Sequence, residues 1–386
     1  MSCTNPPANP PVVNWLFAAA FAVLLMACGP PTPAPSAWQA TESSLLTTGP
    51  YILLGETGVA FIAFKSTDTD EPIVEWKSES SQPTRVPAEK IGNLFVATLQ
   101  SLPGNEVIHY RVVTNSGATE FYPFRVDVGD DESIEFAAFG DTRTGHSVHR
   151  AVIEAMNRED IDFVIHTGDM VANGGRDAEW DKFFQIERPL LSHVPILPSI
   201  GNHDMSARNN YKHYFLHDLW AKGRRYYAKD WGNLRIIAVD GGIECKEGCD
   251  QFQFVEKALR EAVEKDMLVV LFLHYPPFSS GKHGSNLDVQ KPITDLSKQY
   301  GVELVIGGHD HNYERTNPID GTTYLVSGSA GAPIRAVDPQ WFTAHARTEP
   351  HFVLLKVEHK RIILRAVNLR GETFDTTVIN PVAPQP

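Results

Sequence analysis

Hydrophobic and polar residues alternate with a period of two over residues 51–128. Such alternation predicts strands with one buried face, and turn residues such as 115–117 separate the runs at short intervals. The clearest runs are 73–77, 93–97, 107–112 and 121–126. Short strands at this spacing are typical of an antiparallel sandwich, so we expect a small all-β sandwich domain over residues 45–129.

The pattern changes after residue 129, where apolar runs alternate with segments of helical period. Two such segments, near 147–158 and 252–263, each carry four apolar residues on one face. These residues are Val148, Val152, Ile153 and Met156 in the first and Phe252, Val255, Leu259 and Val263 in the second. Asp250 and Gln253 are typical of a capping box at the start of the second helix. We therefore expect an α/β domain over residues 130–380, with ligands gathered at the carboxyl ends of its strands.

The N-terminal region contains an apolar run, residues 15–27, that is too short to span a bilayer comfortably. It indicates a signal peptide over residues 1–27, and the segment ending in Cys28 resembles the lipobox of bacterial lipoproteins. No Lys or Arg precedes the apolar run, so a cleaved signal with an incidental cysteine stays an alternative. The prolines of residues 28–44 predict an extended linker. We expect an exported lipoprotein of a bacterial cell envelope, periplasmic or on the surface, with Cys28 as its membrane anchor.

Chain length and charge bear on the number of domains and on the possible partners. The chain has 386 residues, which favours two domains, and 34 Lys and Arg against 47 Asp and Glu give a net charge of −13. Nucleic-acid binding through counterion release needs clustered basic residues, so we expect no nucleic-acid partner. The acidic balance suits a metal site built from carboxylates, and it equally suits plain solubility.

Two cysteines lie close together at Cys245 and Cys249. In an exported protein they can form a small local disulfide. The alternative is a pair of metal ligands, but no second Cys or His pair at zinc-site spacing accompanies them.

Five polar clusters in the α/β region each follow an apolar run. They are Gly140-Asp141-Thr142-Arg143, Gly168-Asp169, Gly201-Asn202-His203-Asp204, His274 and Gly308-His309-Asp310-His311. A single Gly-Asp after a strand is a common turn. All five together would place carboxylate, amide and imidazole ligands along one edge of a sheet.

These residue types indicate a metal centre. Two carboxylates, one amide oxygen and three imidazoles suit two divalent or trivalent metal ions with one bridging carboxylate. Two ions about 3.5 to 4 Å apart can clamp a phosphoryl group and turn a water into hydroxide near neutral pH. A histidine beside them can then protonate the leaving oxygen.

With these motifs, residues 135–368 resemble the calcineurin-like metallophosphoesterases, and the run 309–315 resembles the purple acid phosphatase branch. The resemblance implies an α/β metallophosphoesterase fold, a β-sandwich flanked by helices, preceded here by a small all-β sandwich domain that resembles fibronectin type III. It also implies a ligand set. In that set Asp169 bridges the metals, Asp141 and His311 bind the first, and Asn202, His274 and His309 bind the second.

The same resemblance assigns substrate-side roles. His203 would face the substrate with Asp204 orienting it, and His283 would be a second histidine on the substrate side. Two positions depart from the family pattern. Arg143 stands where most of the superfamily has histidine, and Ala172 stands where the purple branch has tyrosine. The first metal therefore lacks its usual fourth ligand, and Arg143 either approaches the substrate phosphate or pairs with a neighbouring carboxylate.

The sequence thus predicts a metal-dependent hydrolase that acts on a small phosphate-ester substrate through two metal ions, iron, manganese or zinc. A phosphomonoesterase is the favoured interpretation. The alternatives are a phosphodiesterase and a surface-binding protein with a degraded metal site.

Overall fold

The computed structural model describes residues 45–68, 71–129, 132–206, 208–242 and 248–385. The predicted signal peptide, the linker and Cys28 lie outside these residues, so they stay predictions. Of the helices described, none is long and apolar enough to cross a membrane.

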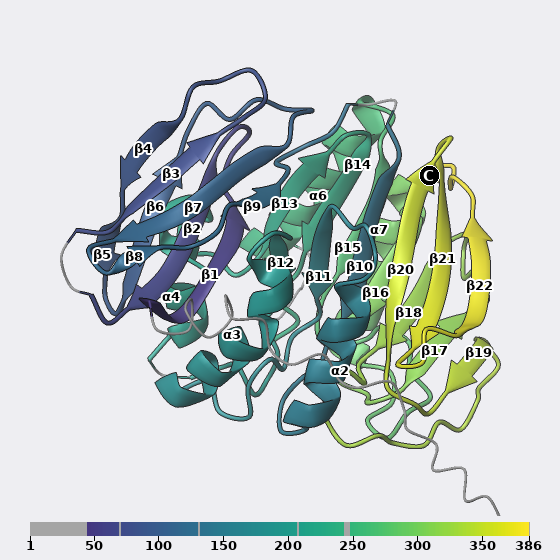
Figure 1. Ribbon diagram of the computed structural model, residues 1–386. Coiled ribbons are helices and arrows are strands. Elements are labelled where there is room, and N and C mark those ends of the chain that lie inside the picture. Colours follow the sequence, from purple (N-terminus) through teal and green to yellow (C-terminus); the bar gives the residue numbers. More distant parts are fainter. Residues whose placement is uncertain (1–44, 69–70, 130–131, 207, 243–247, 386) are drawn as a thin grey trace, which may run out of the picture. The chain divides into compact units, whose positions relative to one another are not determined.

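The N-terminal region forms two antiparallel sheets (Figure 1). One has the order β1 (Leu46–Leu54), β2 (Ala60–Ser66), β6 (Leu94–Leu99) and β5 (Glu89–Ile91). The other has the order β4 (Thr84–Pro87), β3 (Ile73–Lys77), β7 (Ile108–Thr114) and β8 (Gly117–Ala118), and β9 (Tyr122–Phe124) pairs with β7. Burial in β7 alternates residue by residue, which confirms the period of two. The preceding all-β region is confirmed, while its likeness to fibronectin type III stays a prediction.

The remaining strands form two larger sheets. The six-stranded sheet has the order β12 (Ile196–Pro198), β11 (Phe163–His166), β10 (Ile134–Phe139), β20 (His351–Glu358), β21 (Arg361–Asn368) and β22 (Thr373–Ile379). The seven-stranded sheet has the order β13 (Tyr227–Trp231), β14 (Leu234–Ala238), β15 (Leu268–Phe272), β16 (Leu304–Gly307), β18 (Thr323–Ser327), β17 (Tyr313–Thr316) and β19 (Thr343–Arg347). Strands β10, β11 and β12 run parallel, as do β14, β15, β16 and β18.

Alternate residues of these strands face two different layers. Phe136 of β10 and Phe272 of β15 belong to one buried cluster between the sheets, whereas Phe139 and Leu271 belong to clusters on the outer faces. Helices α2 (His146–Met156) and α3 (Asp177–Leu191) contribute to one outer cluster. Helices α6 (Asp250–Glu264) and α7 (Leu287–Tyr300) contribute to the other. The short helices are α4 (Asn210–Tyr214) and α5 (His217–Trp220). The predicted β-sandwich flanked by helices is therefore confirmed.

The two regions share a buried core. Tyr110 of β7 and Phe136 of β10 belong to one continuous cluster, and the Tyr110 hydroxyl donates a hydrogen bond to the Ser192 carbonyl at 2.7 Å. The predicted domain boundary near residue 129 stays a prediction.

The helix predictions were right in position but partly wrong in detail. In α2, Val152, Ile153 and Met156 are buried as expected. In α6, Val263 is 43% exposed, because it lies in the last turn beyond the edge of the packed face.

The capping prediction for α6 was wrong by one residue. Cys249 is the N-cap, and its Sγ accepts a hydrogen bond from the Phe252 N–H. Cys245 lies outside the described residues, so its pairing with Cys249 stays a prediction.

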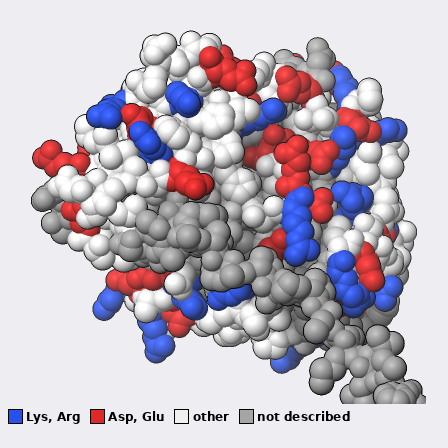
Figure 2. All heavy atoms as spheres, viewed as in Figure 1, with Lys and Arg blue, Asp and Glu red and all other residues white. Residues whose placement is uncertain are grey.

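Acidic and basic side chains are interspersed on the face drawn in Figure 2. The expectation of no nucleic-acid partner stays a prediction.

Candidate metal centre

The five polar clusters follow five strands at their carboxyl ends. Asp141 follows β10, Asp169 follows β11, Asn202 follows β12, His274 follows β15 and His309 follows β16. Parallel strands bring these ends to one edge of each sheet. The hydrogen bonds below show that the five loops meet, as the sequence predicted.

Backbone conformation in these loops is constrained. Asp141, Asp169 and His309 have φ angles of 55°, 54° and 67°, in the left-handed region that costs energy for residues other than glycine. The preceding Gly168 is needed for close approach, because a Cβ there would lie 2.7 Å from the backbone nitrogen of Gly201. Strain at these positions is typical of a functional site.

One cluster of four ligand atoms has the dimensions of a metal site. His274 Nε2 lies 3.1 Å from Asn202 Oδ1, 3.1 Å from His309 Nδ1 and 3.5 Å from Asp169 Oδ1. Four ligands placed tetrahedrally at zinc-like bond lengths are about 3.3 Å apart. The residues predicted for the second metal therefore fit an ion.

The protonation of the two histidines suits this role. The Nδ1–H of His274 donates to the Thr167 carbonyl at 2.9 Å, which leaves the Nε2 lone pair directed into the cluster. Burial, together with the neighbouring His274 and His283, lowers the pKa of His309 to about 3. Burial also lowers the pKa of His274. Both imidazoles are thus neutral near pH 7, the form that binds metals.

The residues predicted for the first metal are arranged differently. His311 Nε2 lies 3.5 Å from Asp141 Oδ1, but the guanidinium of Arg143 also reaches this place. Its Nε donates to Asp169 Oδ2 at 3.0 Å, and its Nη2 lies 3.3 Å from His311 Nε2. Of the two interpretations of Arg143, the salt bridge to a neighbouring carboxylate is the one the structure contains.

His203 lies at the edge of the cluster. Its side chain is 34% exposed, its Nδ1 lies 3.0 Å from the Ala172 carbonyl, and its Nε2 lies 4.0 Å from Asp169 Oδ2. This position suits a group that meets a substrate rather than a buried ligand.

The expected role of Asp204 was wrong. Its carboxylate is fully buried and accepts four backbone N–H groups, from Gly201 and residues 169–171. The Ala172 carbonyl, and not Asp204, contacts the His203 ring. Asp204 therefore holds the Asp169 loop in place.

His283 lies beside His309, and it contacts a residue that the sequence did not reveal; its substrate-side role stays a prediction. Its ring lies over the His309 ring with centroids 4.2 Å apart, and its Nε2 contacts the Arg335 guanidinium. The Arg335 N–H donates to the His311 carbonyl at 3.0 Å. Arg335 follows no motif and no strand end, so only the folded loop places it beside the cluster.

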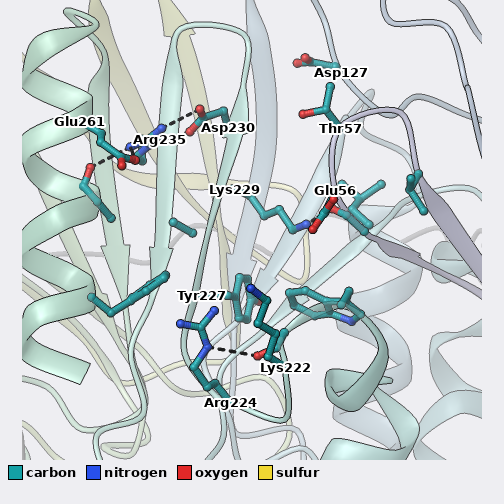
Figure 3. A pocket seen from close by; sticks show the side chains of 18 of the residues that line it. Glu56, Thr57, Asp127, Lys222, Arg224, Tyr227, Lys229, Asp230, Arg235 and Glu261 are labelled. Atoms are coloured by element: carbon teal, nitrogen blue, oxygen red, sulfur yellow. Dashed lines mark hydrogen bonds and ion pairs between the residues drawn. The ribbon is translucent and has the colours of Figure 1, made fainter. Parts of the chain in front are cut away.

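A cavity of about 550 Å³ lies elsewhere and shares no lining residue with the metal cluster (Figure 3). Some of its charged side chains pair with each other. Arg235, for example, donates to Asp230 at 2.6 Å and to Glu261 at 3.3 Å. The predicted chemistry is therefore not in this cavity.

The fold and the metal-ligand cluster can be compared with those of known proteins. The family model described as Calcineurin-like phosphoesterase matches residues 134–313, which include all five clusters. This segment is therefore similar to calcineurin-like phosphoesterases, and its relatives include proteins named as purple acid phosphatases.

The curated relatives share modest identity with this chain. "Probable inactive purple acid phosphatase 24" of Arabidopsis thaliana is 26% identical over 227 residues, which are 47% of this chain and 37% of the relative. "Purple acid phosphatase 3" of the same plant is 24% identical over 286 residues, 62% of this chain and 76% of the relative. "Nucleotide pyrophosphatase/phosphodiesterase" of Hordeum vulgare is 22% identical over 267 residues, 58% of this chain and 73% of the relative. The chain spans about two fifths of the length of the relatives named as probable inactive enzymes.

Two solved structures share the fold. The purple acid phosphatase PPD1 from yellow lupin (Lupinus luteus) seeds superposes with a TM-score of 0.76 at 20% identity, covering 86% of this chain and 74% of the lupin chain. The structure of PhoD superposes with a TM-score of 0.67 at 11% identity, covering 92% of this chain and 94% of that one.

Proposed function

We propose that this protein is a metal-dependent phosphomonoesterase that acts on small phosphate esters. The observation that carries the proposal is the cluster of Asp169, Asn202, His274 and His309. The ligand atoms of the other three residues lie 3.1–3.5 Å from His274 Nε2. Imidazole, carboxylate and amide ligands suit iron, manganese or zinc. Bound there, such an ion supplies Lewis-acid polarisation of the phosphoryl group and makes a nucleophile available near neutral pH.

The surrounding residues supply the proton and hold the substrate. When His203 is protonated, its Nδ1–H is held by the Ala172 carbonyl and its Nε2–H can pass to the leaving oxygen. The Oδ2 atom of Asp169 lies 4.0 Å from this Nε2. The planar guanidinium of Arg143 matches phosphate geometry, and His283 with Arg335 adds donors on the substrate side.

The names of the relatives support two alternatives to a phosphomonoesterase. One relative is named a phosphodiesterase, and three are named probable inactive enzymes. The alternatives are therefore a phosphodiesterase and a surface-binding protein with a degraded metal site.

Hydrolysis of p-nitrophenyl phosphate and of bis(p-nitrophenyl) phosphate, each with added Mn²⁺, Zn²⁺ or Fe²⁺, distinguishes these functions. Faster turnover of the monoester is the expected result. His274→Ala should abolish it, whereas the control His109→Ala, in β7 of the N-terminal region, should not. Faster turnover of the diester would show a phosphodiesterase instead. No turnover of either ester with any of these metals would favour the surface-binding protein.

We further propose that the protein is exported and held at the cell envelope by a lipid on Cys28, a position in the N-terminal segment that the structure does not describe. Cys28→Ser should release the protein from membranes. Complete solubility of the unchanged protein after export would contradict this anchor.

A further inference from the structure

The residues predicted for the first metal lie around the guanidinium cation of Arg143. Arg143 Nε donates to Asp169 Oδ2 at 3.0 Å, and its Nη2 lies 3.3 Å from His311 Nε2. The Nδ1–H of His311 donates to the Pro333 carbonyl at 2.7 Å, so the Nε2 lone pair points at the guanidinium. Arg143 thus engages ligand atoms of two of the three residues predicted for the first metal, Asp169 and His311.

The position of Arg143 is built into the backbone. Its own N–H donates to the Asp169 carbonyl at 3.3 Å, and the Thr142 hydroxyl donates to the Met170 carbonyl at 3.1 Å. The Arg143 side chain is only 12% exposed. These contacts join the loop after β10 to the loop after β11, so the guanidinium is not a loose surface group that happens to fold inward.

The ligand atoms of the two sites are spaced differently. Among the residues that the structure describes, Asp169, His274 and His309 are the one group of His, Cys, Asp or Glu whose ligand atoms all lie within 4.8 Å of one another. Asp141, Asp169 and His311 do not form such a group around the guanidinium. The first set therefore does not fit a metal ion while Arg143 holds this place.

We propose that the Arg143 guanidinium takes the place of the first metal, so that the protein holds one metal ion per chain, at the cluster of Asp169, Asn202, His274 and His309. Asp169 then joins a metal ion to a guanidinium instead of bridging two metals. The fixed guanidinium charge lies beside the metal cluster, where a phosphate dianion would meet both.

The carboxylate of Asp141 favours a second metal ion. Asp141 Oδ1 is buried without a hydrogen-bond partner, although the charge of Arg143 acts on this carboxylate. A second ion could satisfy this oxygen only by displacing the guanidinium from Asp169 and His311. Because two charge-assisted hydrogen bonds would be lost, its affinity should fall by about 10²- to 10⁴-fold.

The test is the metal content of the full chain. The protein is stripped with a chelator and titrated with Zn²⁺ or Mn²⁺ in a calorimeter, and bound metal is counted by mass spectrometry. We expect one equivalent for the wild type and for His311→Ala, and none for His274→Ala. Arg143→His, which replaces the guanidinium with an imidazole, should gain a second equivalent. The matched control Arg335→Ala, which changes a neighbouring guanidinium, should keep one.

Circular dichroism and thermal unfolding show whether each variant is folded, so loss of metal is not confused with loss of structure. Two equivalents in the wild type, falling to one in His311→Ala, would overturn the proposal. A single equivalent in both Arg143→His and Arg143→Ala would also overturn it, because the guanidinium would then not be what excludes the second ion.

This inference rests on the metal cluster of the proposed function, but its test uses no substrate. An inactive protein that binds one ion would refute the function and keep the inference. An active protein that binds two ions would keep the proposed function and refute the inference.

Discussion

The carboxylate of Asp204 accepts the backbone N–H of Asp169 at 2.8 Å, through its Oδ2 atom. The same side chain accepts the N–H groups of Met170, Val171 and Gly201 at 2.9, 3.2 and 2.9 Å. Because Asp169 has a left-handed backbone conformation, its loop needs support from outside. Asp204 supplies this support and so determines where the Asp169 carboxylate points.

Asp204→Asn should therefore weaken metal binding without removing a ligand. The amide nitrogen would face backbone N–H donors, so about half of the four hydrogen bonds would be lost. We expect a loss of about 2–4 kcal/mol in the free energy of unfolding and a 10- to roughly 100-fold lower metal affinity. Calorimetric titration measures the affinity, and Asp288→Asn on the exposed first turn of α7 is the control. Unchanged affinity in a folded Asp204→Asn protein would contradict the positioning role.

His203→Ala should lower turnover and leave the metal content unchanged. If His203 protonates the leaving oxygen, kcat should fall by about 10²- to 10⁴-fold for an alkyl phosphate. The fall should be smaller for p-nitrophenyl phosphate, whose leaving group needs little protonation. An equal loss for both substrates would show that His203 binds phosphate and donates no proton.

Glu303 should make stability depend on pH. Its carboxylate is buried at the start of β16 and accepts the Val269 N–H at 2.7 Å and the Val382 N–H at 3.2 Å. Burial raises the pKa of Glu303 from 4.5 to about 7. Between these values the folded state binds more protons than the unfolded state, so stability falls as the pH rises, by up to about 3 kcal/mol.

Glu303→Gln should remove this contribution. Urea unfolding at pH 5 and pH 8 gives the free energy of unfolding for both proteins. The free energy of unfolding of the variant, minus that of the wild type, should be larger at pH 8 than at pH 5. Glu264→Gln, at the exposed end of α6, should show no such shift.

Tyr51 should couple the N-terminal sheets to the rest of the fold. Its fully buried ring stacks on Phe184 with centroids 4.1 Å apart, and its hydroxyl donates to the Tyr214 carbonyl at 2.7 Å. Tyr51→Ala should lower stability by about 3–5 kcal/mol, and Tyr51→Phe by about 1–2 kcal/mol because only the hydrogen bond is lost.

Because the buried core is continuous, urea should unfold both variants and the wild type in a single transition. The measurement is circular dichroism and tryptophan fluorescence followed together. Two separate transitions, of which Tyr51→Ala shifts only one, would instead show that the N-terminal sheets unfold as an independent domain.

The sequence alone determined the fold class and the place of the metal cluster. Alternation in residues 51–128 and mixed periods after residue 129 predicted the two kinds of sheet. Polar clusters directly after apolar runs predicted ligands at one edge, because parallel strands bring their carboxyl ends together. Asn202, His274 and His309 were therefore found by their local sequence. Helix ends were less certain, as the N-cap of α6 shows, since one residue of shift changes the capping group.

Only the tertiary structure decided which side chains touch. Arg143 and His311 are 168 residues apart in the sequence, and no local pattern reveals that a guanidinium points at an imidazole. Asp204 neighbours His203 in the chain, yet its side chain turns to the Asp169 loop, where four buried N–H groups need an acceptor. Arg335 reaches the site through a loop without any motif. Local sequence determines where a residue enters a site, whereas the satisfaction of buried charges and hydrogen bonds, which depends on every loop at once, determines what it contacts there.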